Sequence, residues 1–460
     1  MEDSPVPAVA TVLHAIREAL TAVAGERETA GAPTRIAIAL SGGRDSMVLL
    51  DALALLAPEL HIDLSAVHVH HGLSPNAERW AEFCVAQCAE RRIPFGVERV
   101  HVERVGGASL EATARAARYA VLGHINADVV ALAHHADDQA ETLLLQLLRG
   151  AGPHGLAAMP RQHPSATGPV LLRPLLGLAR EAIDRYATAR ALAWVEDESN
   201  ANTGIKRNFL RRKIAPSLAK AFPGYPATLV RAARHQAESA TLIDELAALD
   251  ATGAISDVTV GATLDRAQLI ALAERAPHRA RNLLRWFLRQ RGLAAPSAAR
   301  LAAMLQQLTQ AARDARVQLL HDGAELGFHR DRIVVHAPVI APFAILWQGE
   351  PALTLAHGRL EFATCIGAGI ARAALDGVGV TVRTRSGDER IRLAANRPRQ
   401  TLKNLLQNAG MPWWQRVSLP LVFRGDTLAV VPGIGVDVAF QAAPDAPGYA
   451  VHWHPAGREV

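Results

Sequence analysis

The 460-residue chain has few cysteines and no long apolar run, and both shortages narrow the class of protein. Its three cysteines, Cys84, Cys88 and Cys365, are too few for a disulfide framework, which fits a reducing cytoplasm. No apolar run approaches 18 residues, and residues 1–5 lack a basic segment followed by an apolar one. We therefore expect a cytoplasmic protein without a membrane span or a signal peptide.

A Walker phosphate loop is also missing, because the pattern G-x-x-x-x-G-K-[ST] does not occur. The chain has instead a predicted buried strand at 35–40, the hexapeptide Ser-Gly-Gly-Arg-Asp-Ser at 41–46, and helical spacing from there to about Leu56. Such a strand-to-helix turn presents backbone N–H groups to an anion. A simple serine cap is the alternative. Asp45, however, would repel a phosphate unless a cation lay between them, and the combination favours a nucleotide site.

Predicted strands and helices alternate from residue 35 onwards. The predicted strands lie near 35–40, 64–70, 95–102 and 128–133, and the predicted helices near 46–57, 76–91, 110–126 and 138–149. This alternation predicts an α/β fold with a doubly wound parallel sheet, in which ligands bind at the carboxyl ends of the strands. Three polar motifs fall at those ends, at residues 41–46, 68–74 and 134–142.

The motif at 134–142 contains the candidates for a metal site. Asp137 and Asp138 stand where a helix should begin, and Glu141 follows Asp138 by three positions on the same helix face. A capping box is the structural alternative. Beside the aspartate of a phosphate loop, these carboxylates predict Mg²⁺ held between protein and phosphate oxygens. The neighbouring histidines raise the idea of a metal-dependent hydrolase, which we disfavour because such an enzyme has no need of the 41–46 loop.

Seven motifs occur in one order: SGGRDS (41–46), HVHHGLS (68–74), LEATARAARY (110–119), HHADDQAETLLLQLLRGAG (134–152), RPLL (173–176), WVEDESN (194–200) and RNFLR (207–211). Their order and spacing over residues 35–215 resemble those of bacterial tRNA(Ile)-lysidine synthases, which belong to the ATP-pyrophosphatase (PP-loop) superfamily. The resemblance implies an adenine nucleotide α-hydrolase-like fold. It also implies a reaction in which ATP adenylates the C2 oxygen of the wobble cytidine in the CAU anticodon of isoleucine tRNA, and L-lysine then attacks C2 and displaces AMP.

The same resemblance implies roles for individual residues. Asp45 and Asp138 are expected near Mg²⁺, and Glu141 near the base or the lysine amine, where a carboxylate accepts a proton from the attacking ammonium. Arg115 and Arg207 are candidates to neutralise charge on the departing pyrophosphate or AMP. The residues expected on the ATP phosphates are Ser41, Gly42, Gly43, Arg44, Asp45 and Ser46.

Basic residues cluster in the second half of the chain. Residues 275–291 contain six arginines and no acid, and residues 383–416 contain eight basic residues against two acids. A solvated helix face is the simple explanation, but an RNA substrate favours phosphate binding. Trp413 and Trp414 either stack on bases or belong to the hydrophobic core. The expected tRNA-binding residues are Arg281, Arg285, Arg289, Arg397, Arg399 and Lys403.

We expect four segments: a catalytic domain at 1–215, a helical tRNA substrate-binding domain at 216–340, connecting strands at 341–375 and a small basic α+β domain at 376–460. The sequence leaves the oligomeric state open, with a homodimer as one alternative. Two other functions are weighed. A PP-loop tRNA cytidine thiolase would need a thiolate pair or an iron–sulfur cluster, whereas Cys84 and Cys88 are spaced C-x-x-x-C within a predicted helix. A non-catalytic RNA-binding protein would not need intact loop and carboxylate motifs.

Overall fold

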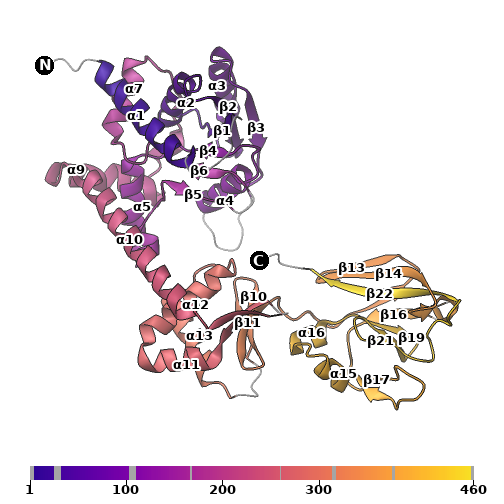
Figure 1. Cartoon of the computed structure of the whole chain (residues 1–460). Coiled ribbons are helices and arrows are strands. Elements are labelled where there is room, and N and C mark those ends of the chain that lie inside the picture. Colours follow the sequence, from indigo (N-terminus) through magenta and orange to yellow (C-terminus); the bar gives the residue numbers. More distant parts are fainter. Residues whose placement is uncertain are drawn as a thin grey trace. The chain divides into compact units, whose positions relative to one another are not determined.

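The computed structural model describes residues 5–24, 33–102, 110–165, 168–258, 261–312, 317–375 and 379–456 (Figure 1). The chain divides into two compact units, Met1–Leu242 and Ile243–Val460. Among the described residues, no helix has both the length and the apolar character needed to cross a membrane.

A six-stranded sheet organises the first unit, with the strand order β3-β2-β1-β4-β6-β5. Five of the strands are parallel and β5 is antiparallel. Because β1 has β2 on one side and β4 on the other, the carboxyl ends of β1 and β4 flank the crevice in which such sheets bind ligands. The strands are β1 (Thr34–Ala39), β2 (Ile62–His70), β3 (Phe95–Arg99), β4 (Val129–Ala131), β5 (Gln162–His163) and β6 (Val170–Leu172).

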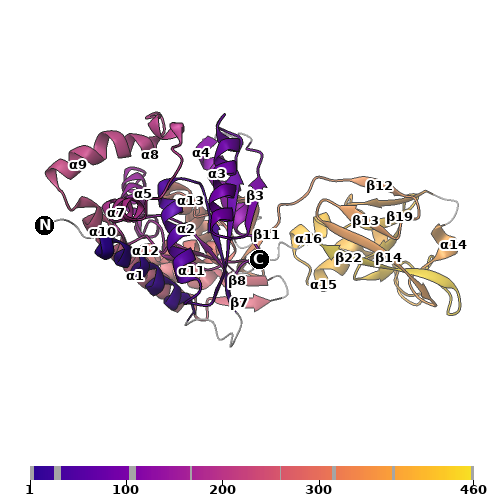
Figure 2. The same cartoon turned by 90° about the horizontal axis from the view of Figure 1, so that it is seen from above.

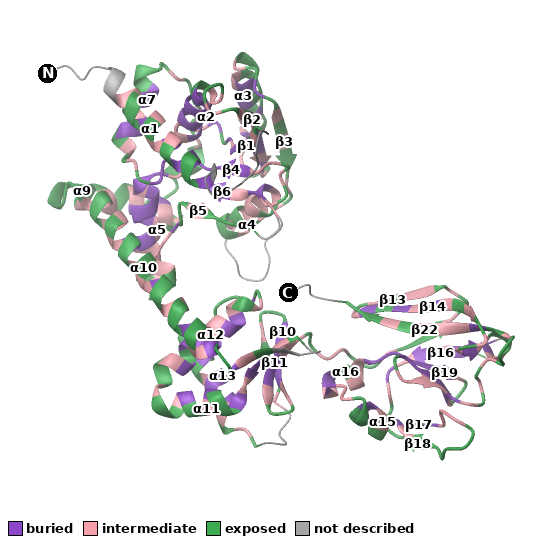
Figure 3. Ribbon diagram, in the orientation of Figure 1, coloured by how far each residue is buried: buried purple, intermediate pink, exposed green. Residues whose placement is uncertain are grey.

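Helices cover both faces of this sheet (Figure 2). One face packs against α1 (Pro5–Ala24), α2 (Arg44–Leu56), α3 (Ala77–Glu90) and α7 (Arg180–Ala189). The other face packs against α4 (Leu110–Leu122), whose Leu122 is fully buried. Figure 3 shows β1 and α2 as the buried centre of the unit, as expected for a strand and a helix rich in apolar residues. This arrangement confirms the predicted doubly wound fold.

The remaining helices of the first unit carry the polar residues of the site. They are α5 (Ala136–Leu148), α6 (Pro153–Leu156), α8 (Lys206–Phe209), a π-helical turn (Leu210–Ile214) and α9 (Ala215–Ala221). The helix α10 (Tyr225–Ala251) contains the boundary between the two units.

The first part of the second unit, up to His336, combines helices with a sheet. Three helices pack with a five-stranded antiparallel sheet, ordered β7-β8-β11-β10-β9, around one core. The predicted middle domain is therefore not purely helical, and the short strands β7 and β8 were missed. The elements are β7 (Ile255–Val258), β8 (Gly261–Asp265), α11 (Arg266–Arg275), α12 (Pro277–Gln290), α13 (Ala298–Gln310), β9 (Leu319–His321), β10 (Ala324–His329) and β11 (Arg332–His336).

The rest of the second unit is mostly β-structure. One sheet has the order β12-β16-β19-β20-β21, a second has the order β13-β14-β22-β15, and β17 pairs with β18. The strands are β12 (Ala344–Trp347), β13 (Ala352–Leu355), β14 (Gly358–Ile366), β15 (Ile370–Ala371), β16 (Val380–Arg383), β17 (Arg390–Ile391), β18 (Gln400–Thr401), β19 (Leu421–Arg424), β20 (Thr427–Val431), β21 (Gly435–Val436) and β22 (Pro447–Pro455). The helices are α14 (Arg372–Leu375), α15 (Leu402–Asn408) and α16 (Trp413–Ser418).

The expected connecting segment at 341–375 is instead part of these sheets. β12 pairs with β16, and β14 pairs with β22 along its whole length, from Gly358 opposite Pro455 to Ile366 opposite Pro447. A separate segment was therefore an incorrect prediction, because within the described residues its strands pair only with strands of 376–460 and with one another. The helix α15 begins at Leu402, directly after the strand β18.

Candidate active site

The loop between β1 and α2 is shaped by Gly42 and by the serines on either side of the glycines. Gly42 has a φ of +82°, and a Cβ atom there would lie 2.9 Å from Val195 Cγ2, so a larger residue would be strained and crowded. The Val195 N–H donates to the Gly42 carbonyl at 3.0 Å, which brings a distant segment onto the loop. Ser46 Oγ donates to the Gly43 carbonyl at 2.8 Å and lies 3.1 Å from Ser41 Oγ. The hydroxyls and the start of α2 thus gather at one place.

Arg44 lies on this loop but turns toward other protein groups. Its guanidinium forms an ion pair with Asp184 of α7, and its Nε lies 3.5 Å from Asp45 Oδ1. The Asp45 Oδ1 atom is buried and accepts no hydrogen bond from a described residue. A carboxylate oxygen that accepts no hydrogen bond and has only this long ion pair with Arg44 is suited to bind a further cation.

Asp45 and Asp138 converge on one histidine. Asp45 Oδ2 lies 3.6 Å and Asp138 Oδ2 3.5 Å from Nε2 of His135, and Asp137 Oδ2 lies 3.5 Å from its Nδ1. Burial alone would lower the pKa of His135, but its contacts with Asp137 and Asp45 raise the pKa to about 10. Burial would raise the pKa values of Asp45 and Asp138, yet the His135 imidazolium outweighs it and lowers both. The carboxylates are therefore ionised at neutral pH.

The start of α5 does form a capping box, three residues earlier than the sequence suggested. The helix begins at Ala136 with His135 as its N-cap, and Asp138 Oδ2 accepts a hydrogen bond from the His135 N–H at 3.1 Å. Asp138 therefore combines a capping role with a place beside Asp45. Glu141 takes no part in this capping box.

Two arginines instead hold the buried Glu141. Arg207 Nε donates to Glu141 Oε2 at 2.8 Å, while Arg211 donates from Nε to Oε1 at 2.6 Å and from a terminal nitrogen to Oε2 at 2.9 Å. Both arginines also reach Asp138 Oδ1, at 3.2 and 3.1 Å. Arg211 was not among the predicted site residues. The two arginines are four positions apart, a spacing that places both side chains on the same side of a helix.

The predicted Arg115 lies on α4, exposed, and donates to the Tyr119 hydroxyl at 3.3 Å. Its neighbour Arg118 is more deeply placed: burial lowers the pKa of its guanidinium, and its buried Nε donates to no described residue. Burial also lowers the pKa of His134 to about 3, and the positive charges of Arg118 and Arg207 act in the same direction. Arg118 is therefore a further cation near the carboxylates that sequence reasoning did not select, although it shares a helix face with Arg115.

The predicted magnesium ligands fit that ion only if phosphate oxygens complete the site. Among the described residues, no group of three or more His, Cys, Asp or Glu side chains is arranged to hold a metal ion. Asp45 and Asp138 supply two neighbouring carboxylates and no more. Mg²⁺ is commonly bound by one or two carboxylates together with substrate phosphates and water, so this donor set suits a metal that arrives with a nucleotide.

Comparisons with known proteins agree with this geometry. A PP-loop domain matches residues 13–218, a TilS substrate binding domain residues 268–334 and a TilS substrate C-terminal domain residues 380–453. The tRNA(Ile)-lysidine synthase of Nitrosomonas europaea is 42% identical over 432 residues, which cover 92% of each chain. The chain belongs to the tRNA(Ile)-lysidine synthase family. Family membership confirms the resemblance seen in the motifs and makes the chain an ATP-dependent ligase.

Other relatives show the same extent of likeness. The tRNA(Ile)-lysidine synthase of Chromobacterium violaceum is 43% identical over 427 residues, covering 91% of this chain and 95% of that protein. Among solved structures, the U34-tRNA thiolase NcsA from Methanococcus maripaludis is 19% identical and covers 50% of this chain and 80% of its own, with a TM-score of 0.42. That score is too low to support an argument about function.

The predicted tRNA-binding residues lie in the two parts of this lysidine synthase family member that match substrate domains. On α12, Arg281 is exposed, Arg289 is paired with Asp244, and burial together with Arg281 and Arg289 lowers the pKa of Arg285. The opposite side of α12 belongs to the core, with Leu284, Phe287 and Leu288 fully buried. The residues Arg397, Arg399 and Lys403 are all exposed, at and just before the start of α15.

Proposed function

We propose that this enzyme ligates L-lysine to C2 of the wobble cytidine in the CAU anticodon of isoleucine tRNA. The reaction proceeds through an adenylated cytidine, releases pyrophosphate and then AMP, and gives lysidine. One observation carries the proposal beyond family membership: Asp45 of the phosphate loop and Asp138 of α5 lie beside the same nitrogen of His135, and Arg207 and Arg211 bind Asp138 and Glu141. We also propose a cytoplasmic location, where free tRNA, ATP and lysine occur together.

The first step would use the phosphate loop. Ser41, Ser46 and the start of α2 would bind the ATP phosphates through hydroxyl and N–H donors. Asp45 and Asp138 would hold Mg²⁺, which supplies charge neutralisation to the phosphates when bound. The cytidine oxygen attacks the α-phosphorus and pyrophosphate leaves. Arg115 on α4, with the deeper Arg118, would offset the charge that develops on the departing group.

The second step needs a base, since the lysine ε-ammonium is unreactive until it loses a proton. An ionised carboxylate has about four acceptor positions. The two arginines use three of those of Glu141, two on Oε2 and one on Oε1. We assign the position left on Oε1 to the ammonium, which Glu141 would deprotonate as the amine attacks C2 and AMP leaves.

The cysteines argue against the thiolase alternative. Cys84 and Cys88 are both fully buried in α3, and burial raises their pKa values to about 12 and about 11. A thiol with so high a pKa is a poor nucleophile and a poor ligand at neutral pH. Sulfur transfer therefore has no candidate residue in this part of the fold.

The deciding experiment is incorporation of labelled lysine into an unmodified isoleucine tRNA transcript with a CAU anticodon, in the presence of ATP and Mg²⁺, followed by nucleoside analysis. We expect labelled lysidine and one AMP for each lysine incorporated. A methionine tRNA with a CAU anticodon serves as the control for substrate choice and should remain unlabelled. Absence of lysidine, with pyrophosphate exchange on another RNA, would keep the adenylation chemistry and refute lysine as the nucleophile.

A further inference from the structure

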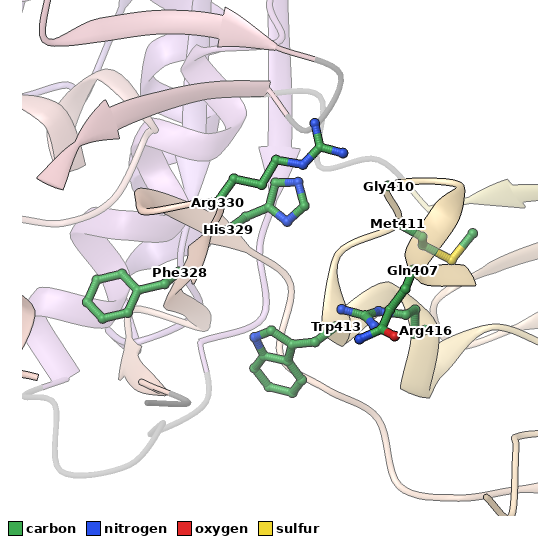
Figure 4. Close-up of a pocket in the computed structure, with 8 residues that line it drawn as sticks. All are labelled: Phe328, His329, Arg330, Gln407, Gly410, Met411, Trp413 and Arg416. Atoms are coloured by element: carbon green, nitrogen blue, oxygen red, sulfur yellow. The ribbon is translucent and has the colours of Figure 1, made fainter. Parts of the chain in front are cut away.

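The second unit contains a pocket that the proposed reaction does not use. It has a volume of about 240 Å³ and two walls (Figure 4). One wall is the end of β10 and the turn after it, with His329 and Arg330. The other is formed by α15, α16 and the turn between them, with Gln407, Trp413 and Arg416. The volume is well above the ~30 Å³ of one water molecule and below the ~300–1,000 Å³ of drug-sized sites, which suits one planar ring.

A buried aromatic stack fixes the two walls against each other. Trp414 is almost fully buried and stacks on the His336 ring, with centroids 4.1 Å apart and ring planes 1° apart. Its ring also meets His329 edge-on at 6.0 Å. Trp414 therefore belongs to the core, one of the two predicted alternatives. Trp413, whose ring lies at 87° to that of Trp414, is only half-buried and lines the pocket.

The backbone on the far wall is shaped to admit a guanidinium. Gly410 has a φ of +71°, and a Cβ atom there would lie only 2.6 Å from a terminal nitrogen of Arg330. Glycine thus serves both the turn and the close approach of Arg330. The neighbouring residue Asp331 forms an ion pair with Arg266, so its negative charge is not available to Arg330 only.

The lining is cationic and aromatic, without a carboxylate among its eight residues. Arg330 and Arg416 both line the pocket beside His329. Burial, followed by the charges of these two arginines, lowers the pKa of His329, so its imidazole is neutral at pH 7. An indole face, two guanidinium groups and the Gln407 amide together match the three parts of a nucleotide: base face, phosphate and base edge. Such platforms suit bases that are not paired in a duplex.

We propose that this pocket binds an unpaired nucleotide at the single-stranded 3′ end of the tRNA substrate, with the base stacked on Trp413 and its phosphate beside Arg330 and Arg416. The inference rests on the proposed function, which commits the anticodon loop to the first unit. In a folded tRNA, most bases outside that loop are paired or stacked in the tertiary structure, and the 3′ end is the longest unpaired single strand. The 3′ end is therefore the part of the substrate whose chemistry matches the pocket.

The test is a cycle of tRNA dissociation constants, measured with the full-length protein at one salt concentration. Two ligands are used: the intact transcript and the same transcript without its unpaired 3′ nucleotides. For the unaltered protein, we expect the truncation to weaken binding by about 5- to 150-fold, the range for losing one stacked base. Trp413→Ala should weaken binding of the intact tRNA by a similar factor and show little further loss on truncation.

Three more variants make the result specific. Trp413→Phe keeps an aromatic face and should keep most of the affinity. Arg330→Ala removes an exposed side chain on the other wall, without risk to the Trp414 core, and should also reduce the truncation effect. Arg372→Ala is the matched control: an exposed arginine of the same unit outside the pocket lining, whose loss should leave the truncation effect unchanged.

The inference would be overturned if the unaltered protein bound both transcripts equally, or if Trp413→Ala and Arg330→Ala kept the full truncation effect. The pocket would then be a gap between two packed parts of the unit that binds no nucleotide. Because the cycle measures affinity alone, its outcome is independent of lysine transfer. If the dissociation constants behave as expected but no lysidine forms, the proposed reaction is refuted. If lysidine forms but truncation of the tRNA does not weaken binding, the proposed role of the pocket is refuted.

Discussion

Replacing Glu141 by glutamine tests whether this carboxylate takes part in the reaction or only holds the arginines. The change removes the negative charge and replaces one oxygen by an NH2 group, which donates and cannot accept a hydrogen bond. With the NH2 group in the place of Oε1, the hydrogen bond from Arg211 Nε is lost, and the two hydrogen bonds to Oε2 become neutral. Each of these three changes costs about 1 kcal/mol. Both arginines keep Asp138 at 3.2 and 3.1 Å, so the loss should fall below the ~3–5 kcal/mol of a fully broken buried pair.

We therefore expect the free energy of unfolding of the first unit to fall by about 2–3 kcal/mol. For a unit of this size, that corresponds to a decrease in Tm of about 5–10 °C. Activity should be compared well below the lower Tm, with the two half-reactions measured separately. Pyrophosphate release without lysine reports adenylation, and lysine added to the adenylated tRNA reports transfer. Glu141→Gln should slow transfer by about 10²–10⁴-fold, the usual contribution of a general base, and leave adenylation within about 10-fold.

Arg211→Gln is the matched control, because it breaks most of the same contacts from the other side and leaves the carboxylate in place. It should lose a similar amount of stability while transfer and adenylation fall by similar, small factors. If Glu141→Gln instead slowed both half-reactions equally, and Arg211→Gln did the same, Glu141 would act only by positioning the arginines. The assignment of the proton to Glu141 would then be wrong.

Four further predictions follow from other contacts. Asp138→Asn removes a carboxylate beside Asp45 and weakens the cap of α5, so adenylation should fall by at least about 100-fold with tRNA affinity nearly unchanged; normal pyrophosphate release would contradict this. A chain that ends at residue 340 should bind tRNA at least tenfold more weakly and keep its KM for ATP. A chain that ends at residue 375 should aggregate, because it leaves the strand β14 without its partner β22. Arg281→Ala should reduce the slope of log Kd against log salt by about 0.7–0.9, and Arg289→Ala by less because Asp244 already neutralises it; equal slopes would contradict phosphate contact by Arg281. Iodoacetamide should modify Cys365 first in the native protein at pH 8. The rate of modification of Cys84 and Cys88 should rise with pH up to their raised pKa values of about 12 and 11. Labelling of all three cysteines at equal rates would show that α3 opens.

The first unit was largely predictable because its signals are local. The strands β1 and β4 are short and largely apolar, and the polar motifs at 41–46 and 134–142 begin within three positions of their ends. The order of the strands in the structure brings the 41–46 loop and the start of α5 together. Motifs at strand ends thus predicted a shared carboxylate site, while the pairing of Asp45 with Asp138 was implied by the family resemblance.

The parts that were missed depend on contacts between distant residues. The partners of Glu141 lie 66 and 70 positions away, and nothing in the local pattern says that Arg207 and Arg211 turn toward it. The strands of 341–375 likewise take their partners from across 376–460, at a separation that no local pattern reveals. β7 and β8 contain only four and five residues, too few for a period-two pattern to stand out beside helices.

The basic run at 206–213 shows why a count of charges could not assign its role. Arg207 and Arg211 point inward and bind Glu141, whereas Arg212 and Lys213 are exposed. A π-helical turn, a feature common at functional sites, begins at Leu210 and contains Arg211, Arg212 and Lys213. One short segment therefore supplies both the cations that bind Glu141 and two exposed cations that we expect to contact RNA. A phosphate bound by Arg212 or Lys213 would lie within one helical turn of the side chains that set the geometry of Glu141. In the proposed reaction, the position of the RNA would thereby be linked to the position of the proton acceptor.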